Sequence, residues 1–147
     1  MAVVLAVFLG VAYDLGIRVN VQTGSVAAPA AAASPEDVVR AYVEAYNHRD
    51  FATMTTIYPE GQAAFSRFRA MGTMHHLQVV GSRVATDSDL AGTFPKAGHS
   101  YYRVEVRFDY ADLAGSDLAY ENGPSGSTYW LERGSTDESW TITDQGF

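Results

Sequence analysis

The sequence predicts an α+β domain in which helices come first and antiparallel strands follow. Apolar residues recur with a helical period of about 3.6 from Ser34 to Met71. After Gly72 the period changes to about 2, as in strands that bury one face. The 147 residues, 47% of them apolar, suffice for one domain that buries its own core.

The first helix is predicted to begin at Pro35 and to run for about 14 residues. Ser34 is a suitable N-cap, and proline suits the first helical position. Glu36 and Asp37 lie near the positive end of the helix dipole. The apolar stripe of this helix would contain Val38, Val39, Tyr42, Val43, Ala45 and Tyr46.

Two further helices are predicted before the strands begin. Asp50 can cap a short helix over Phe51–Tyr58, and Pro59 would end it. A third helix is predicted over Gln62–Met71, with Phe65 on its apolar side.

Four strands are predicted in the second half of the chain, over Leu77–Ala85, Ser100–Tyr110, Ser127–Arg133 and Trp140–Thr143. In the second of them, apolar positions alternate with mostly charged ones, so this strand would cover a core with one face only. The polar, glycine-rich segments Thr86–His99 and Ala111–Gly126 are predicted to be loops.

The chain divides into three predicted zones: 1–22, 23–35 and 36–147. Met1–Tyr13 carries no charge, but it is shorter than the roughly 20 residues that span a bilayer, and no basic n-region precedes it. We expect it to be the distal part of a signal anchor, which would tether an extracytoplasmic domain; the alternative is a buried element of a cytoplasmic protein. Residues 23–35, rich in Ala and Pro, are predicted to be a flexible linker.

Charge and cysteine content exclude several classes of function. The formal charge is −7, with seventeen acidic and ten basic residues, so a nucleic-acid partner is not expected. Without cysteine there is no disulfide framework, thiolate nucleophile or Cys-ligated zinc. No phosphate loop, nucleotide fingerprint or nucleophile elbow occurs, and no cofactor is predicted.

The order of these segments resembles the nuclear transport factor 2-like (cystatin-like) superfamily over residues 34–147. The resemblance is carried by the helix with its Asn47-His48-Arg49-Asp50 turn, by Leu77–Gly81 and by the long alternating strand. Tyr129–Leu131 and the ending Trp140–Phe147 complete it. It implies a cone in which helices pack on a strongly curved antiparallel sheet, often around a hydrophobic pocket.

The superfamily contains both enzymes and non-catalytic domains, so the resemblance alone does not give a function. In its enzymes a short strand carrying an acidic base usually follows the second helix, whereas here Tyr58-Pro59-Glu60-Gly61 leads directly into another predicted helix. Asp50, Glu60 and His76 remain weak candidates for a catalytic base. N-capping for Asp50 and a solvated helix start for Glu60 explain these two residues better.

No metal site is predicted. His75 and His76 are neighbours on a predicted strand and would point to opposite faces. Asp87 and Asp89 lie in a polar loop without the pattern of a calcium loop. The alternating charges of the long strand, at Arg103, Glu105 and Arg107, favour a solvated ion-pair face or a subunit contact.

Aromatic residues are the candidates for a ligand pocket, because small-molecule sites are mostly apolar with a few polar anchors. The candidates are Tyr42, Tyr46, Phe65, Tyr102, Phe108, Trp130 and Trp140. The competing interpretation is a filled core, for which a domain of this size also needs large side chains.

Three hypotheses follow. The first is a membrane-tethered, extracytoplasmic interaction or scaffold domain that binds a protein partner or a second copy through a sheet face, with residues 1–13 as the tether. The second is a small-molecule-binding domain that uses an aromatic pocket in the cone. The third is a lyase, isomerase or cyclase with the same fold.

Overall fold

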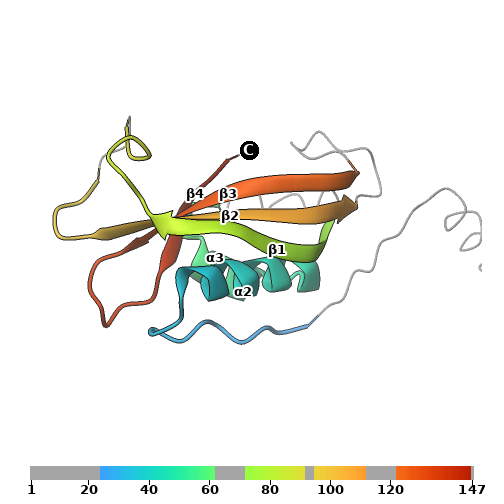
Figure 1. The fold of residues 1–147 in the computed structure, drawn as a ribbon. Helices are drawn as coiled ribbons and strands as arrows, with labels where there is room; N and C mark the ends of the chain where they lie inside the picture. The colour runs from blue at the N-terminus through green and yellow to red at the C-terminus, as the bar shows by residue number, and fades with distance from the viewer. Residues whose placement is uncertain (1–23, 62–71, 92–94, 112–121, 147) are drawn as a thin grey trace, which may run out of the picture.

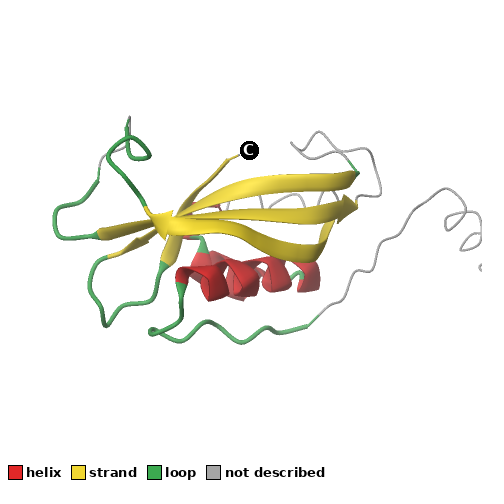
Figure 2. Cartoon of the chain, viewed as in Figure 1, coloured by secondary structure: helices red, strands yellow, loops and turns green. Residues whose placement is uncertain are grey.

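The computed structural model of the chain describes residues 24–61, 72–91, 95–111 and 122–146. Within these ranges the α+β prediction is confirmed, since helices come first and an antiparallel sheet follows (Figure 2). The elements are α2 (Pro35–His48), α3 (Phe51–Ile57), the short 3₁₀ helix η1 (Pro59–Gly61), β1 (Thr73–Val84), β2 (Ser100–Ala111), β3 (Gly123–Arg133) and β4 (Thr141–Gly146).

The four strands form an antiparallel meander in the order β1-β2-β3-β4, and the two helices lie on one face of it (Figure 1). The first helix, α2, packs against β1 and β2, whereas α3 and η1 pack against β4. The core therefore lies between one sheet face and the helices.

Helix α2 has the start that the sequence predicts. Ser34 is the N-cap, and its hydroxyl accepts a hydrogen bond from the N–H of Asp37 at 3.2 Å. The helix ends at Arg49, which adopts the left-handed conformation with φ of 57°. All six residues of the predicted apolar stripe are buried.

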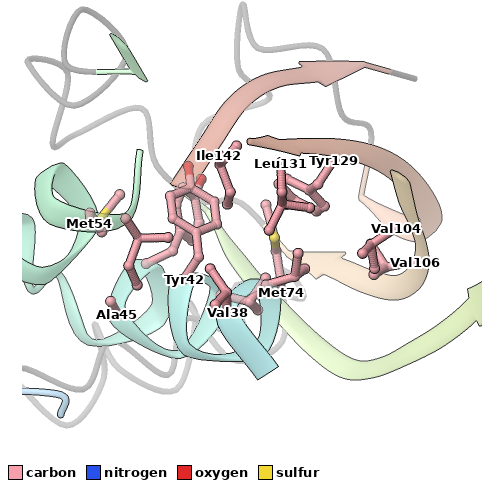
Figure 3. Packing of buried hydrophobic residues seen from close by; sticks show 14 of the residues in the cluster. Val38, Tyr42, Ala45, Met54, Met74, Val104, Val106, Tyr129, Leu131 and Ile142 are labelled. Carbon is pink, nitrogen blue, oxygen red and sulfur yellow. The ribbon is translucent and has the colours of Figure 1, made fainter. Parts of the chain in front are cut away.

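The core is dominated by aromatic and β-branched side chains (Figure 3). The ring of Tyr42 on α2 meets Tyr129 on β3 edge to face, with centroids 5.8 Å apart, and contacts Tyr58 in the same way. Other core members on the sheet are Met74, Val104, Val106, Phe108, Tyr110, Leu131 and Ile142.

All four strands differ from the prediction at their ends, and β2 reaches Ala111, one residue beyond its predicted end. β1 begins at Thr73, four residues before the predicted start, and contains a bulge between His75 and Gln78 where His76 has φ of 54°. β3 begins at Gly123, so the prediction of a loop as far as Gly126 is wrong for its last four residues. β4 starts one residue later than predicted and extends to Gly146.

Residues 24–34, which we call the strap, run along α2 from its C-terminal end back to its N-terminal end (Figure 1). The N–H of Gly24 donates to the carbonyl of His48 at 3.3 Å. Val26 is only 9% exposed and belongs to the core. The linker composition of residues 23–35 does not reveal this contribution, and it does not show that Pro35 already belongs to α2.

Asn47 connects the end of α2 to the beginning of β1. Its amide nitrogen donates to the carbonyl of Met74 at 2.7 Å, and its amide oxygen accepts from the N–H of the same residue at 2.8 Å. Among the strands that the structure describes, β1 lies at the edge of the sheet, so one side of its backbone has no described strand partner. The side chain of Asn47 thus supplies both bonds that a neighbouring strand would make.

Arg49, which is buried, also connects the end of α2 to the beginning of β1. It is 8% exposed, stacks on the ring of Tyr46, and donates to the carbonyls of Tyr46 and Gly72 at 2.7 Å each. The N–H of Gly72 donates in turn to the hydroxyl of Tyr110. A side chain at Gly72 would collide with the backbone of Ala111, so this close approach requires glycine.

Several predictions fall outside the described residues. These are the apolar run Met1–Tyr13, the rest of zone 1–22, and the third helix over Gln62–Met71 with Phe65. In the ranges that the structure covers, no helix combines the length and the apolar character needed to cross a membrane.

Candidate functional site

A hollow of about 500 Å³ opens at the end of the sheet where β1 and β3 end and β2 begins. In Figure 1 this is the left end, from which the loops after β1 and β3 project. The hollow is lined by Val84, Ala85, Leu90, His99, Ser100, Tyr101, Tyr102, Arg133 and Trp140. This lining joins apolar and aromatic surface to a few polar groups, as in sites that bind small molecules.

Strand register positions the aromatic wall of the hollow. Tyr102 pairs with Val84 on one side and with Leu131 on the other, and Trp140 immediately precedes β4. The rings of Tyr102 and Trp140 meet edge to face with centroids 5.8 Å apart. Two of the predicted ligand-binding residues therefore do come together.

Arg133 provides a cation at this wall. Its guanidinium carbon lies 4.4 Å from the centroid of the Trp140 ring, which is a cation–π contact. No carboxylate within the described ranges lies at ion-pair distance from Arg133. A guanidinium without a carboxylate partner beside an apolar surface is suited to receive an anionic group.

His99 belongs to the same lining and contacts Glu132 on β3. Its Nδ1 lies 2.6 Å from Oε1 of Glu132, and Nζ of Lys96 lies 2.8 Å from the same oxygen. Burial alone would raise the pKa of Glu132, but the contacts with Lys96 and His99 outweigh it and lower the pKa. The carboxylate is therefore ionised at neutral pH, accepts a hydrogen bond from Lys96 and is in contact with His99.

The other predicted aromatic residues do not join the hollow. Tyr42, Tyr46 and Phe108 are buried in the core, where burial raises the pKa of the Tyr46 hydroxyl and keeps it protonated. Trp130 alternates with buried neighbours on β3, so it lies on the opposite face of the sheet, over Gly146. Phe65 lies outside the described residues.

Asp50 is placed as a structural residue. One carboxylate oxygen accepts from the N–H of Val26 and from the hydroxyl of Thr53, both at 2.8 Å, and the other accepts from the N–H of Thr53 at 3.2 Å. It thus caps α3 and also holds the strap. The backbone N–H of Val26, followed by the two Thr53 donors, lowers the pKa of Asp50, which disfavours a role as general base.

Asp50→Asn should change how stability depends on pH. A carboxyl whose pKa is lower in the folded state stabilises the protein above its unfolded value of 3.8, and this stabilisation is lost as the pH falls through the folded value. The variant should therefore be less stable than the wild type at pH 7, and the difference should shrink below pH 3.8. Urea unfolding of both proteins between pH 7 and pH 3 measures this difference in the free energy of unfolding. A difference that stays constant over this pH range would contradict the stabilising role of the Asp50 carboxylate.

Glu60 and His76, the other catalytic candidates, belong to different elements from Asp50, and neither lines the hollow. Glu60 is an exposed residue of η1. His76 occupies the β1 bulge, with its side chain 81% exposed and its Nδ1 2.8 Å from Asp109. The structure therefore does not bring the three candidates together.

A second hollow of about 330 Å³ lies between α2 and β1 and includes His48 and His75 in its lining. Nε2 of His75 is 2.8 Å from the hydroxyl of Thr73. Among the residues that the structure places, no group of three His, Cys, Asp or Glu side chains could hold a metal ion.

Arg103 and Glu105, on the face of the sheet opposite α2, form an ion pair. Nη1 of Arg103 lies 2.6 Å from Oε1 of Glu105, and Nε of Arg103 lies 4.0 Å from Asp89. Arg83 donates to both oxygens of Asp89 and holds the pKa of that carboxyl well below its usual range. This arrangement matches the ion-pair interpretation of the alternating charges.

Sequence reasoning missed Arg133 and His99 as members of a site. Neither belongs to a motif, and 34 positions separate them in the chain. Only the pairing of β2 with β3, which aligns Ser100 with Arg133, brings them to one place. Compared with known protein families, curated proteins and solved structures, the chain matches none of them.

Proposed function

We propose that this protein is a binding domain whose hollow takes a small amphipathic anion, such as an aromatic or aliphatic carboxylate. The observation that carries the proposal is Arg133, a cation without a described carboxylate partner, stacked on Trp140 in the wall of an apolar hollow. The apolar body of the ligand would pack on Tyr102 and Trp140, and its anionic group would pair with the guanidinium.

This proposal is a form of the small-molecule hypothesis, with the pocket at the end of the sheet instead of inside a cone. We favour it over binding through the sheet face because the charged residues there already satisfy one another, as in the Arg103–Glu105 pair. It is also favoured over catalysis, since Asp50 is occupied by three hydrogen bonds and the candidate bases are dispersed.

The proposal extends to fold and location. The helices on one face of a four-stranded antiparallel meander support a nuclear transport factor 2-like cone. The uncharged run Met1–Tyr13 supports an N-terminal tether that presents the domain outside the cytoplasm. Expression of the full chain, followed by separation of membrane and soluble fractions, tests the tether; recovery only in the cytoplasmic fraction would contradict it.

Binding can be tested with 3-phenylpropanoate as the probe and with its uncharged amide as the matched control. The chain has two tryptophans, so Trp130→Phe leaves Trp140 as the only indole and Trp140→Phe leaves Trp130. We expect the carboxylate to change the tryptophan fluorescence of wild type and of Trp130→Phe, but not of Trp140→Phe. A signal carried by Trp130 alone, or no binding at all, would contradict the proposal.

Arg133→Gln should weaken binding of the carboxylate about tenfold or more, because a charge-assisted bond is lost. Affinity for the amide should change much less. Isothermal titration calorimetry of both ligands measures the two changes. Equal losses for carboxylate and amide would mean that Arg133 only shapes the aromatic wall.

A further inference from the structure

The ring of His99 has a defined orientation at the hollow. Its Nδ1 lies 2.6 Å from a carboxylate oxygen of Glu132, and a carboxylate this close favours a proton on that nitrogen over a lone pair. Its Cε1 faces Gly134, since a Cβ on that glycine would lie 3.3 Å from it. His99 lines the hollow, and of its two ring nitrogens Nε2 is the one that does not contact Glu132.

With a proton on Nδ1, beside Glu132, the two charge states of the ring differ by the proton on Nε2. A protonated Nε2 is a charged donor toward the hollow, whereas a neutral Nε2 presents a lone pair to it. The same position therefore attracts an anion in one state and repels it in the other.

The charges around His99 come from three segments. Glu132 and Arg133 belong to β3, Lys96 precedes His99 in the loop after β1, and Glu138 lies in the loop after β3, where its Oε2 would be 2.7 Å from a Cβ on Gly134. The hydroxyl of Tyr101 on β2 accepts from the N–H of Lys96. Since Glu132 is shared between Lys96 and His99, its charge is largely neutralised.

We propose that His99 is a second anion-binding residue of the hollow and makes ligand binding depend on pH. The imidazolium donates from Nε2 to the carboxylate that Arg133 also receives, and loss of that proton releases the ligand. This inference rests on the proposed function, because it concerns the same ligand in the same hollow. The inference adds His99 as a residue that determines specificity for anions, and it adds a rise in pH as the condition under which the ligand is released.

The test is the affinity of the full chain for 3-phenylpropanoate at pH 6.0 and pH 8.0, in 0.15 M salt, with the amide as the uncharged control. Histidine is the side chain whose charge changes between pH 5 and pH 8, so the two values bracket the change on which the proposal depends. We expect the dissociation constant of the carboxylate to rise at least fivefold from pH 6.0 to pH 8.0. The dissociation constant of the amide should stay unchanged.

His99→Gln should bind the carboxylate with the same affinity at both pH values, close to that of wild type at pH 8.0. His76→Gln is the matched control, because His76 also contacts a carboxylate, at 2.8 Å, but lies toward the other end of β1. It should keep the full pH dependence of wild type. Glu132→Gln provides a second variant, and it should move the midpoint of the pH dependence downward, since the imidazolium loses its ionised partner.

The outcomes separate the two proposals. If the carboxylate binds through Trp140 and Arg133 but shows no pH dependence, the role of His99 is wrong and the binding function stands. If His99→Gln keeps the pH dependence or His76→Gln removes it, the role of His99 is also wrong. If neither carboxylate nor amide binds at the hollow, both proposals are overturned.

Discussion

Asn47→Ala is expected to lower the free energy of unfolding by about 2–4 kcal/mol, because each buried backbone group left without a partner costs roughly 1–3 kcal/mol. The substitution removes both hydrogen bonds between the amide of Asn47 and the backbone of Met74, which is only 3% exposed. Domains of this kind have a total stability of about 5–15 kcal/mol. Denaturation by urea, followed by tryptophan fluorescence, measures the loss.

Asn47→Asp refines the test, because a carboxylate can accept from the N–H of Met74 but cannot donate to its carbonyl. At pH 7 this variant should be at least as unstable as Asn47→Ala. Near pH 4, partial protonation restores a donor, so its deficit relative to wild type should narrow. Gln78→Ala, at an exposed amide on the same strand, should stay within about 0.5 kcal/mol of wild type. A small effect of Asn47→Ala would show that water replaces both bonds.

Removal of residues 1–33, so that the chain begins at Ser34, is expected to lower the free energy of unfolding by roughly 2–4 kcal/mol. The estimate combines the burial of one valine side chain with the loss of hydrogen bonds to the strap. Val26 packs in the core, its N–H donates to Asp50, and its carbonyl accepts from the hydroxyl of Thr53 at 3.1 Å. The Ala- and Pro-rich composition of residues 23–35, by contrast, predicts a flexible linker whose removal leaves the free energy of unfolding unchanged.

A chain that begins at Gly24 is the matched control, since it keeps the whole strap. Val26→Ala should reproduce about half of the loss, whereas Val80→Ala, at a valine that is 49% exposed, should be nearly neutral. Thermal and urea unfolding measure the stability of the two shortened chains and of the two valine variants relative to wild type. Equal stability of the chains that begin at Gly24 and Ser34 would show that the strap contributes nothing.

The parts of the fold that follow local rules could be predicted from the sequence. Ser34, Pro35 and the apolar stripe define α2 because capping and helical period act over a few neighbouring residues. The start of β3 could not be predicted, because Gly123–Gly126 has the composition of a turn and is held in the sheet by its pairing with residues 107–110. The early part of β1 was missed because the bulge at His76 breaks the alternation.

In the candidate site, too, some residues could be predicted from the sequence, whereas others depend on long-range contacts. Tyr102 and Trp140 could be selected because large aromatic residues are few and often line pockets. Which aromatic residues are enclosed by the core and which border the hollow depends on long-range packing, and the sequence does not separate Tyr42 and Phe108 from Trp140, which is itself only 7% exposed. Val26 is a core residue that the sequence does not identify. It is one apolar residue among Ala, Pro and Ser and gives no periodic signal, yet it is buried.

The path of the strap places the start of the described chain and the hollow at different ends of the domain. The chain enters beside His48, at the end of α2 where Asn47 meets the start of β1, whereas the hollow lies at the end of β1, near Val84. Ten residue steps of β1 separate Met74 from Val84, which corresponds to about 33 Å of strand. The point where the strap begins and the hollow therefore lie at opposite ends of β1.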